Sequence, residues 1–351
     1  MTKNEVLTRS DLSLNGAMRA AFLGLSGLAL TDDERAAFRD ADPAGFILFR
    51  RNVGDKAQLR ALTDSLRTLS GRADLPVLVD QEGGRVARLA PPEWPSFPPA
   101  WRFSELYDKA PISAIEAARV NGEAIGLILA EMGINVDCMP VLDVRHPGAH
   151  DVIGDRAYGA EPMRVAALGK ATLEGLAAAG VCGVIKHMPG HGRAHVDSHH
   201  ELPVVDVAEA ELVDDLRPFQ ALREAPIGMT AHLLYAAWDE ERPATLSPTI
   251  IADIIRARIG FDGLLMSDDL AMEALSGTLA ERAARAIAAG CDIALHCSGV
   301  LAESLQVVEA AGPMSEAASG RLAAAMTRSV SASTQSFDAL VAKRDALLAY
   351  A

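Results

Sequence analysis

The sequence predicts an α/β fold: one (β/α)8 barrel of the TIM type, followed by a C-terminal helical extension. Short apolar runs alternate with longer amphipathic segments along the 351 residues, a pattern typical of βα units around a parallel sheet. Eight of the apolar runs fit strands, the number that closes such a barrel. Because these barrels reach about 250 residues or more as one unit, we expect a single domain over 1–351, with the extension over about 300–351.

Each predicted strand is a short apolar run bounded by turn or helix signals. In chain order the runs are residues 21–25, 45–49, 76–80, 134–143, 181–187, 227–234, 263–269 and 292–296. Helices are predicted from residue 31, over 55–69, 113–132 and 161–179, and beyond the last strand. A Pro- and Trp-rich stretch over 91–101 predicts an irregular excursion, and a long loop is expected from the fifth strand to about residue 203.

Polar or ionisable residues end five of the predicted strands. They are Asp80, Asp143, Lys186 with His187, Asp268 with Asp269, and His296. A barrel of this type carries its functional site at the carboxyl ends of its strands. We therefore expect these side chains to meet at one mouth.

Charge and cysteine usage narrow the class of partner and the compartment. The chain has 33 basic and 47 acidic residues, a formal net charge of −14, which disfavours nucleic acid as a partner. No run approaches the roughly 18 apolar residues of a membrane span, and the N-terminus lacks the apolar segment of a signal peptide. The four cysteines, at 138, 182, 291 and 297, have no C-x-x-C spacing and do not form a disulfide framework. A cytoplasmic protein is predicted.

Histidine is concentrated in one segment, residues 186–200, which holds five of the nine histidines. Four of them, at 187, 191, 195 and 199, recur every fourth position, and on a helix they would make a metal-binding face. Pro189, Gly190 and Gly192 argue against a continuous helix, so we predict a functional loop at the mouth and no metal site. A metal-dependent hydrolase remains the remote alternative. Structural or exposed roles are expected for His191, His195 and His200.

Within this loop, Asp197 precedes His199 by two residues. An aspartate at that distance can accept a hydrogen bond from one imidazole nitrogen, raise the imidazole pKa and direct the other nitrogen at a substrate. This is the base-and-orienter arrangement of a catalytic triad without its serine. The alternative is an ordinary hydrogen bond within a loop.

Two further segments suggest a polar ligand. The run 263–270 ends in Asp268 and Asp269, and buried acids are costly unless they have a use. One could act as nucleophile or base while the other caps the following helix, and the residues alone do not say which. In 80–88, a Gly-Gly turn separates Asp80 from Arg88, and both side chains could bind hydroxyl groups.

Together these segments resemble the family 3 glycoside hydrolases, in particular the bacterial β-N-acetylglucosaminidase branch. The matching stretches are residues 80–86, 186–192 with 197–199, and 263–270, and their order and spacing agree over about 20–298. The resemblance implies a TIM-barrel enzyme that removes terminal GlcNAc with retention of configuration and without a cofactor. Met188, and Ala157 with Tyr158, differ from the residues that relatives usually have, but none of these positions carries a charged role.

The resemblance also implies a role for each site residue. Asp268 would be the nucleophile and His199, assisted by Asp197, the acid/base. Sugar-binding roles fall on Asp80, Arg88, Arg156, Lys186 and His187. If His199 is not the acid, Glu82 is the first carboxylate to consider.

The expected substrate is a small sugar or muropeptide, a GlcNAc-1,6-anhydro-muramoyl fragment of peptidoglycan, cleaved by double displacement. A histidine acid repels an anionic leaving group less than a glutamate does. The main alternative is a phosphorylase that uses the same Asp–His dyad, and a non-catalytic sugar-binding barrel is a further one. The sequence indicates no particular oligomeric state.

Overall fold

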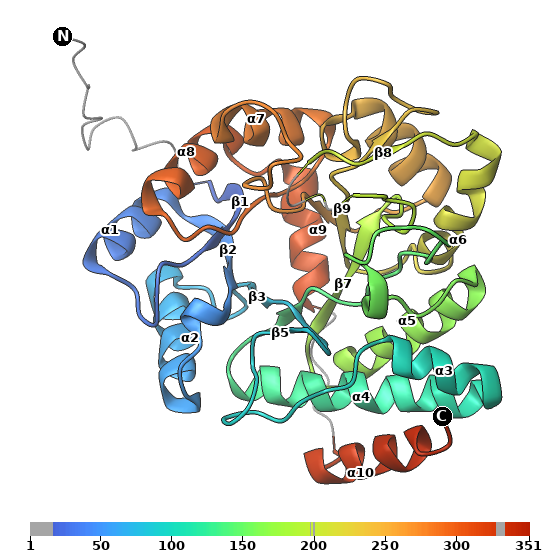
Figure 1. Ribbon diagram of the computed structural model, residues 1–351. Coiled ribbons are helices and arrows are strands. Elements are labelled where there is room, and N and C mark those ends of the chain that lie inside the picture. The colour runs from blue at the N-terminus through green and yellow to red at the C-terminus, as the bar shows by residue number, and fades with distance from the viewer. Residues whose placement is uncertain (1–16, 197, 199–200, 328–333) are drawn as a thin grey trace.

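The protein is described by a computed structural model that covers residues 17–196, 198, 201–327 and 334–351. Eight parallel strands follow each other around one sheet in chain order (Figure 1). They are β1 (Arg19–Gly24), β2 (Pro43–Leu48), β3 (Val77–Val79), β6 (Val136–Asp137), β7 (Cys182–Met188), β9 (Ile227–Thr230), β11 (Leu264–Met266) and β12 (Ala294–His296). The first strand pairs with the last, and Met266 bridges Ile293, which closes the sheet. The predicted (β/α)8 fold class is confirmed.

Helices follow the strands and form a ring around the sheet (Figure 1). They are α1 (Asp32–Ala41), α2 (Lys56–Ser70), α3 (Trp101–Lys109), α4 (Pro111–Glu131), α5 (Pro162–Ala178), α6 (Val213–Ala221), the π-helix η5 (Ile250–Ile259), α7 (Leu279–Ala289) and α8 (Leu301–Ala311). The first begins as the sequence predicts, because Thr31 and Glu34 form a capping box at its start.

The barrel strands have buried side chains along nearly their whole length, which explains their continuous apolar runs. Phe22, Leu48, Val79, Ile185 and Leu265 are at most 1% exposed. Burying one such side chain contributes about 1.5–3 kcal/mol. The strands therefore form a rigid frame, and the residues that follow their carboxyl ends are held in fixed positions.

Three strands end three or more residues before their predicted ends, for local reasons. The fourth, expected over 134–143, leaves the ladder after Asp137, because Pro140 has no N–H to donate. The chain rejoins briefly where Val141 bridges Lys186. The sixth, expected over 227–234, stops at Thr230, and the seventh, expected over 263–269, stops at Met266. In each case the segment beyond the strand belongs to the functional end of the barrel.

A small hairpin stands at the mouth beyond β3. It consists of β4 (Gln81–Gly83) and β5 (Val86–Ala87), which pair antiparallel. Gly83 has a φ of 95°, and a Cβ there would lie 2.4 Å from the carbonyl oxygen of Pro98. The Gly-Gly turn is thus required by close backbone contact. A second pair, β8 (Val204–Val205) with β10 (Leu234–Tyr235), ties the loop after β7 to the loop after β9.

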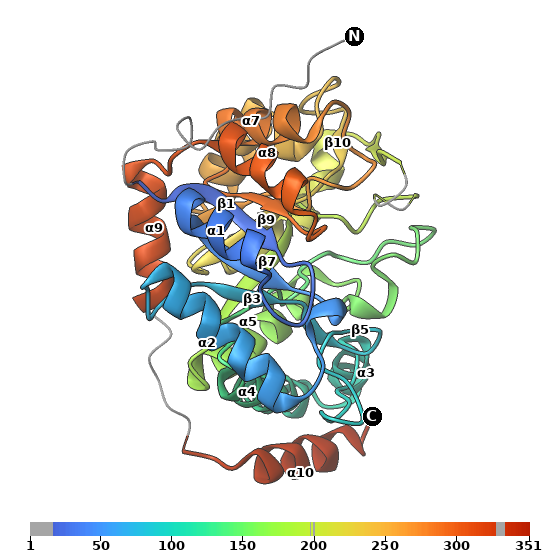
Figure 2. The ribbon, with the colours of Figure 1, turned by 90° about the vertical axis from the view of Figure 1, so that its left-hand side faces the viewer.

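Two helices lie beyond the eighth βα unit, α9 (Glu316–Thr327) and α10 (Phe337–Leu348). In Figure 2, α9 lies on the side of the barrel opposite β5, so it covers the end away from the mouth. Its Arg321 binds Asp262 and Asp292, which precede β11 and β12. The last helix packs under α4 (Figure 1), where Lys343 pairs with Glu116. Because α8 belongs to the barrel, the helices of the extension begin later than residue 300.

All four cysteines are buried, and none of them forms a disulfide. Among the helices of the described residues, none is long and apolar enough to cross a membrane.

Candidate active site

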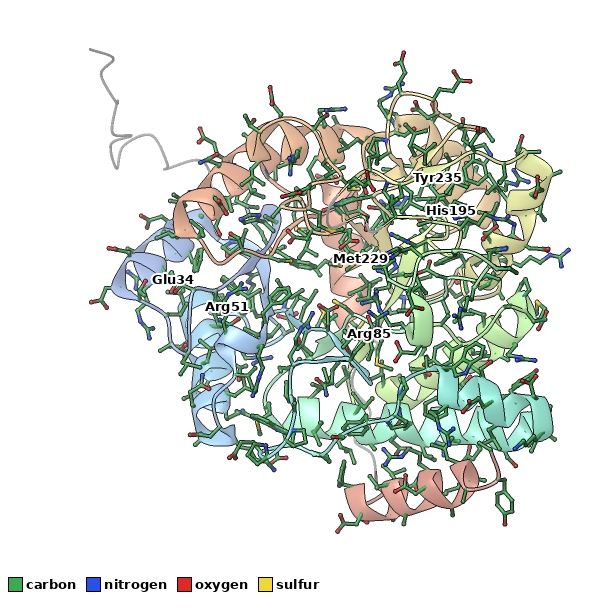
Figure 3. All side chains as sticks on the ribbon, viewed as in Figure 1. Glu34, Arg51, Arg85, His195, Met229 and Tyr235 are labelled. Carbon is green, nitrogen blue, oxygen red and sulfur yellow. The ribbon has the colours of Figure 1, made fainter. Side chains whose placement is uncertain are left out.

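A cavity of about 510 Å³ opens where the barrel strands end. Its polar lining comes from the residue after β3, the β4–β5 hairpin, strand β7 and the loops after β6, β7 and β11: Asp80, Glu82, Arg85, Arg88, His150, Asp151, Arg156, Lys186, His187, His191, Ser198, Asp268 and Asp269. Six of the residues predicted from the sequence lie in this wall: Asp80, Arg88, Arg156, Lys186, His187 and Asp268. In Figure 3, two other wall residues, Arg85 and Met229, lie near the middle of the barrel.

One side of the cavity is a network of alternating charges. Lys186 Nζ lies 3.0 Å from Asp80 Oδ1 and 2.7 Å from Glu82 Oε1. Arg156 donates through Nε and Nη2 to both oxygens of Glu82, each at 2.8 Å, and Arg88 lies 3.1 Å from Asp80. The bidentate contact fixes the plane of the guanidinium group. Polar groups held in this way are pre-oriented for a polar ligand.

Burial and charge act in opposite directions on the pKa values of this network. Burial alone would raise the pKa of Asp80 and of Glu82, but the cations Lys186, Arg88 and Arg156 outweigh it and hold both values below the usual range. For Lys186, burial would lower the pKa, but Glu82 and Asp80 raise it. Asp80, Glu82 and Lys186 therefore stay charged at neutral pH. Glu82, ionised and bound by two cations, is therefore unsuited to donate a proton, which argues against it as the alternative acid.

His187 is oriented from below by Asp143. Its Nδ1 lies 2.7 Å from Asp143 Oδ2, and Oδ1 of the same carboxylate accepts the backbone N–H groups of His187 and His191. Nδ1 therefore carries a proton, and Nε2 is available to the cavity. Asp143 was expected at the mouth, but it is fully buried and supports the imidazole instead of lining the cavity.

The adjacent aspartates after β11 have different surroundings. Asp268 Oδ1 accepts one hydrogen bond, from the N–H of Asp269 at 2.8 Å. Asp269 Oδ1 instead accepts from the N–H groups of Ala271 at 3.0 Å and Cys297 at 3.1 Å. The Asp269 carboxylate thus closes the turn after β11 and binds the backbone that follows β12. It does not cap α7, whose N-cap is Thr278.

The pKa values of the two carboxyls move in opposite directions. Burial would raise the pKa of Asp268, but His232 and His187 outweigh it and lower that pKa. Burial dominates at Asp269 and raises its pKa. The carboxyl whose pKa is lowered, Asp268, is the one that does not fix the backbone of the turn. The paired carboxylates can thus be told apart from their hydrogen bonds.

Other predicted positions lie apart from this wall or outside the described residues. His296 is buried beside Ser298 and does not line the cavity, contrary to the expectation that all the strand-end residues meet there. His191 is a buried wall residue bonded to Ser198, and burial together with His187 lowers its pKa to about 4. His195 is exposed and contacts the carbonyl of Gly148. Asp197, His199 and His200 lie outside the described residues.

The roles of two residues in the site were not predicted from the sequence. Glu82 was considered only as an alternative acid, but it is the centre of the charge network, and its place between Asp80 and Arg88 in the hairpin motif is the signal that could have indicated this role. His232 lies beside the aspartate pair and bonds to Thr245 and to the Asp269 carbonyl. His232 was not singled out because it falls within the strand expected over 227–234, where it would be an ordinary core residue.

The geometry of the histidine-rich segment gives no metal centre in the described part of the chain. Across those residues, no three side chains of histidine, cysteine, aspartate or glutamate gather as metal ligands would. His187, His191 and His195 each direct a ring nitrogen to a different protein partner.

Known proteins resemble this chain over most of its length. Residues 17–331 match the model of the glycosyl hydrolase family 3 N-terminal domain. A β-hexosaminidase of Bordetella avium is 38% identical over 279 residues, which are 78% of this chain and 79% of that one. The crystal structure of NagZ from Neisseria gonorrhoeae with N-trifluoroacetyl-D-glucosamine superposes with a TM-score of 0.82 at 31% identity, and covers 95% of this chain and 98% of that one. The same protein in complex with zinc ion gives a TM-score of 0.79 at 30% identity, over 95% and 97%.

With the barrel and its carboxylate-bearing cavity, these matches define a glycoside hydrolase. The chain belongs to glycoside hydrolase family 3. Within that family it is an enzyme of the β-hexosaminidase type.

Proposed function

We propose that the chain is a retaining exo-β-N-acetylglucosaminidase that removes terminal GlcNAc from peptidoglycan fragments, in particular GlcNAc-1,6-anhydro-muramoyl species. The single observation that carries the proposal is the ionised carboxylate of Asp268 in a cavity whose facing wall holds Asp80, Lys186 and Arg88. A cavity of about 510 Å³ falls in the range that encloses small-molecule ligands. The sugar analogue in the NagZ complex favours an N-acylated glucosamine as the ligand.

Asp268 is proposed as the nucleophile because it meets both requirements of that role. A carboxylate nucleophile must be ionised, and the neighbouring imidazoles lower the pKa of Asp268. It must also be free to form a covalent bond, and the described structure uses only one of its oxygens, for the N–H of Asp269. Asp269 is less suited to the role, because its pKa is raised and its Oδ1 accepts two backbone N–H groups that fix the carboxylate in the turn.

The acid/base role is proposed for His199 assisted by Asp197, both outside the described residues. In the first step an oxygen of Asp268 attacks the anomeric carbon, the bond from that carbon to the leaving oxygen breaks, and His199 gives the leaving oxygen a proton. In the second step neutral His199 takes a proton from water, whose oxygen attacks the anomeric carbon and releases Asp268. Two inversions give retention of configuration.

The sugar-binding roles of Asp80, Arg88, Arg156, Lys186 and His187 remain part of the proposal. Three cations and Asp80 offer both donors and an acceptor to ring hydroxyls and to the acyl oxygen. His187 presents Nε2 with its ring fixed by Asp143. We place the non-reducing GlcNAc against this wall and the leaving group toward the loop that carries His199.

A muramic acid leaving group and the cytoplasm are the finer parts of the proposal. A histidine acid carries no negative charge in either protonation state, so it does not repel the carboxylates of a muropeptide. Four buried free thiols suit a reducing compartment. Neither a cofactor nor a metal has a step in the proposed reaction.

Product analysis on a muropeptide mixture tests the proposal. Released GlcNAc, with the β-anomer formed first in a proton NMR time course, is the expected result. A parallel reaction in phosphate buffer tests the phosphorylase alternative, which predicts GlcNAc-1-phosphate in place of GlcNAc. Initial release of the α-anomer of GlcNAc, or no cleavage of any fragment with terminal GlcNAc, would contradict the proposal.

A further inference from the structure

His232 is a fully buried histidine two residues beyond the end of β9, and it is not in the cavity wall. Its Nδ1 lies 2.8 Å from Thr245 Oγ1 and its Nε2 lies 2.9 Å from the carbonyl oxygen of Asp269. Both ring nitrogens are therefore engaged, one by a side chain and one by the backbone next to Asp268. Any buried imidazole needs hydrogen-bond partners, so the informative observation is the identity of one of them, the carbonyl of Asp269.

The partners of His232 determine which nitrogen carries the proton. The Asp269 carbonyl can only accept, so Nε2 must donate to it. Burial lowers the pKa of His232 and the charge of Asp268 opposes this, but Nε2 donates to the carbonyl whatever the charge of the ring. Thr245 Oγ1, 2.8 Å from Nδ1, also lies 3.0 Å from the Ala231 carbonyl, to which its proton can go, and Thr230 Oγ1 lies 2.7 Å from Thr245. The chain Thr230–Thr245–His232 thus ends in one N–H aimed at residue 269.

Residue 269 is held from three directions. Its carbonyl accepts from His232 and, at 3.1 Å, from the N–H of Met272. Its side chain accepts from Ala271 and Cys297. Its own N–H is the donor that holds Asp268 Oδ1. The orientation of the Asp268 carboxylate therefore depends on how firmly residue 269 is fixed.

We propose that His232 is a positioning residue for Asp268, which acts by donating its Nε2–H to the Asp269 carbonyl and so holding the attached N–H against the nucleophile. This inference rests on the proposed function, in which Asp268 attacks the sugar. His232 itself touches neither the sugar nor the reacting atoms. Among the donors to residue 269 in the described part of the chain, His232 is the one that follows the neighbouring strand β9, so it links the turn after β11 to that strand.

The positioning role predicts a loss in the chemical step without a loss in sugar binding. Displacing a reacting group by about 1 Å can cost about 10²-fold in rate. The charge network that holds the sugar lies on β3, β4, β7 and the loop after β6, and does not use His232. A purely structural role would instead lower the melting temperature and leave the turnover of the folded fraction intact.

Two amide variants with different reach make the test. In His232→Gln the amide nitrogen can occupy the place of Nε2, whereas in His232→Asn it reaches only as far as Nδ1. The readouts are kcat on nitrophenyl-GlcNAc, the Ki of GlcNAc as a product inhibitor, and the rate at which a 5-fluoro-GlcNAc inactivator labels Asp268. We expect kcat and the labelling rate of His232→Asn to be about 10²-fold below those of the wild-type protein. Both rates should be about tenfold higher in His232→Gln than in His232→Asn. The Ki of GlcNAc should change little in either variant.

His146→Gln is the control, because His146 is a histidine outside the cavity wall whose Nε2 bonds Asp215 and not residue 269. Its stability should fall without the selective loss in labelling rate. Equal activity of the Gln and Asn variants, or labelling of Asp268 in the Asn variant at the wild-type rate, would overturn the inference. If the inactivator labels a residue other than Asp268 in the wild-type protein, the proposed function itself fails. That experiment needs no His232 variant, so the two failures can be told apart.

Discussion

The N–H of Asp269 donates a hydrogen bond of 2.8 Å to Oδ1 of Asp268, so the second aspartate of the pair holds the carboxylate of the first. The dependence runs in one direction, because the side chain of Asp269 is occupied by the backbone of Ala271 and Cys297. The two carboxyls are adjacent in sequence but serve separate purposes. Several of the expected effects of substitution derive from this separation.

Asp268→Asn should abolish turnover, because an amide oxygen is too weak a nucleophile to replace a carboxylate. Asp269→Asn should keep measurable activity, since its Oδ1 can still accept the two backbone N–H groups and its own N–H remains. Steady-state kinetics on nitrophenyl-GlcNAc compares the two. In the wild-type protein a 5-fluoro-GlcNAc inactivator should add its mass to the stretch 263–273, at Asp268. An adduct on Asp269, or no adduct, would contradict the assignment.

Glu82→Gln should reduce kcat/KM by about 10²-fold, and equally for a natural sugar and a nitrophenyl leaving group. The reason is that Gln cannot bind Arg156 and Lys186 as an ion, so both cations lose their fixed positions. Glu116→Gln is the control, because it removes an ion pair of the same kind on the protein surface, where such pairs contribute about 0–1 kcal/mol. If the nitrophenyl substrate were spared, Glu82 would be the general acid after all.

The folding stability should fall as the pH drops from 6.5 to about 4, in part because of His191. Burial depresses its pKa in the folded protein from 6.5 to about 4, so the unfolded chain binds more protons over that interval. At 1.36 kcal/mol per pKa unit, complete titration would cost roughly 3 kcal/mol. Urea unfolding at a series of pH values should show a shallower fall for His191→Gln. Parallel curves for the two proteins would mean that His191 is not buried as a neutral group.

Removal of metal should not affect catalysis, although the similar NagZ from Neisseria gonorrhoeae has been crystallised with zinc ion. The imidazoles of His187, His191 and His195 are each engaged by Asp143, Ser198 and the Gly148 carbonyl, respectively. Activity after treatment with a chelator and dialysis should equal that of the untreated enzyme. Activity that disappears with the chelator and returns with added zinc would establish a metal requirement.

The barrel could be predicted from the sequence because its strands are buried on all sides and read as continuous apolar runs. The apolar runs do not show where each strand leaves the hydrogen-bond ladder of the sheet. Pro140 interrupts the fourth strand, and the chain turns inward after Thr230 and Met266. At those points tertiary contacts replace the ladder, as the His232–Asp269 bond does. Strand ends therefore differ from the prediction mainly at the mouth, where the functional residues lie.

The site could be predicted in part, because packing a barrel seldom requires charged residues at the carboxyl ends of its strands. Asp80, Lys186 and Asp268 lie in the cavity wall, as that reasoning predicts. Glu82 and Asp143 act through partners 74 and 44 residues away in the chain, and sequence spacing gives no sign of such long-range pairs. His296 has the same pattern as the others, but its ring turns to Ser298, which only the fold decides.

The effect of replacing His199, the proposed acid, should depend on the leaving group. A general acid contributes about 10²–10⁴-fold, or roughly 2.7–5.5 kcal/mol at about 1.36 kcal/mol per decade. That contribution matters only where the leaving oxygen needs a proton. His199→Ala should therefore slow the cleavage of a natural sugar leaving group severely but spare the first step on nitrophenyl-GlcNAc, where the glycosyl-enzyme should accumulate as a burst.

Asp197→Ala should give the same pattern more mildly, because Asp197 orients the imidazole without transferring the proton. The double variant should be little worse than His199→Ala, since residues that act as one unit give non-additive losses. Stopped-flow measurement of nitrophenol release separates the burst from the steady state in all three variants. Equal losses on both leaving groups would make His199 a binding residue. Because the cations around Glu82 keep that carboxylate ionised, the acid would then have to lie among the other groups of the cavity wall.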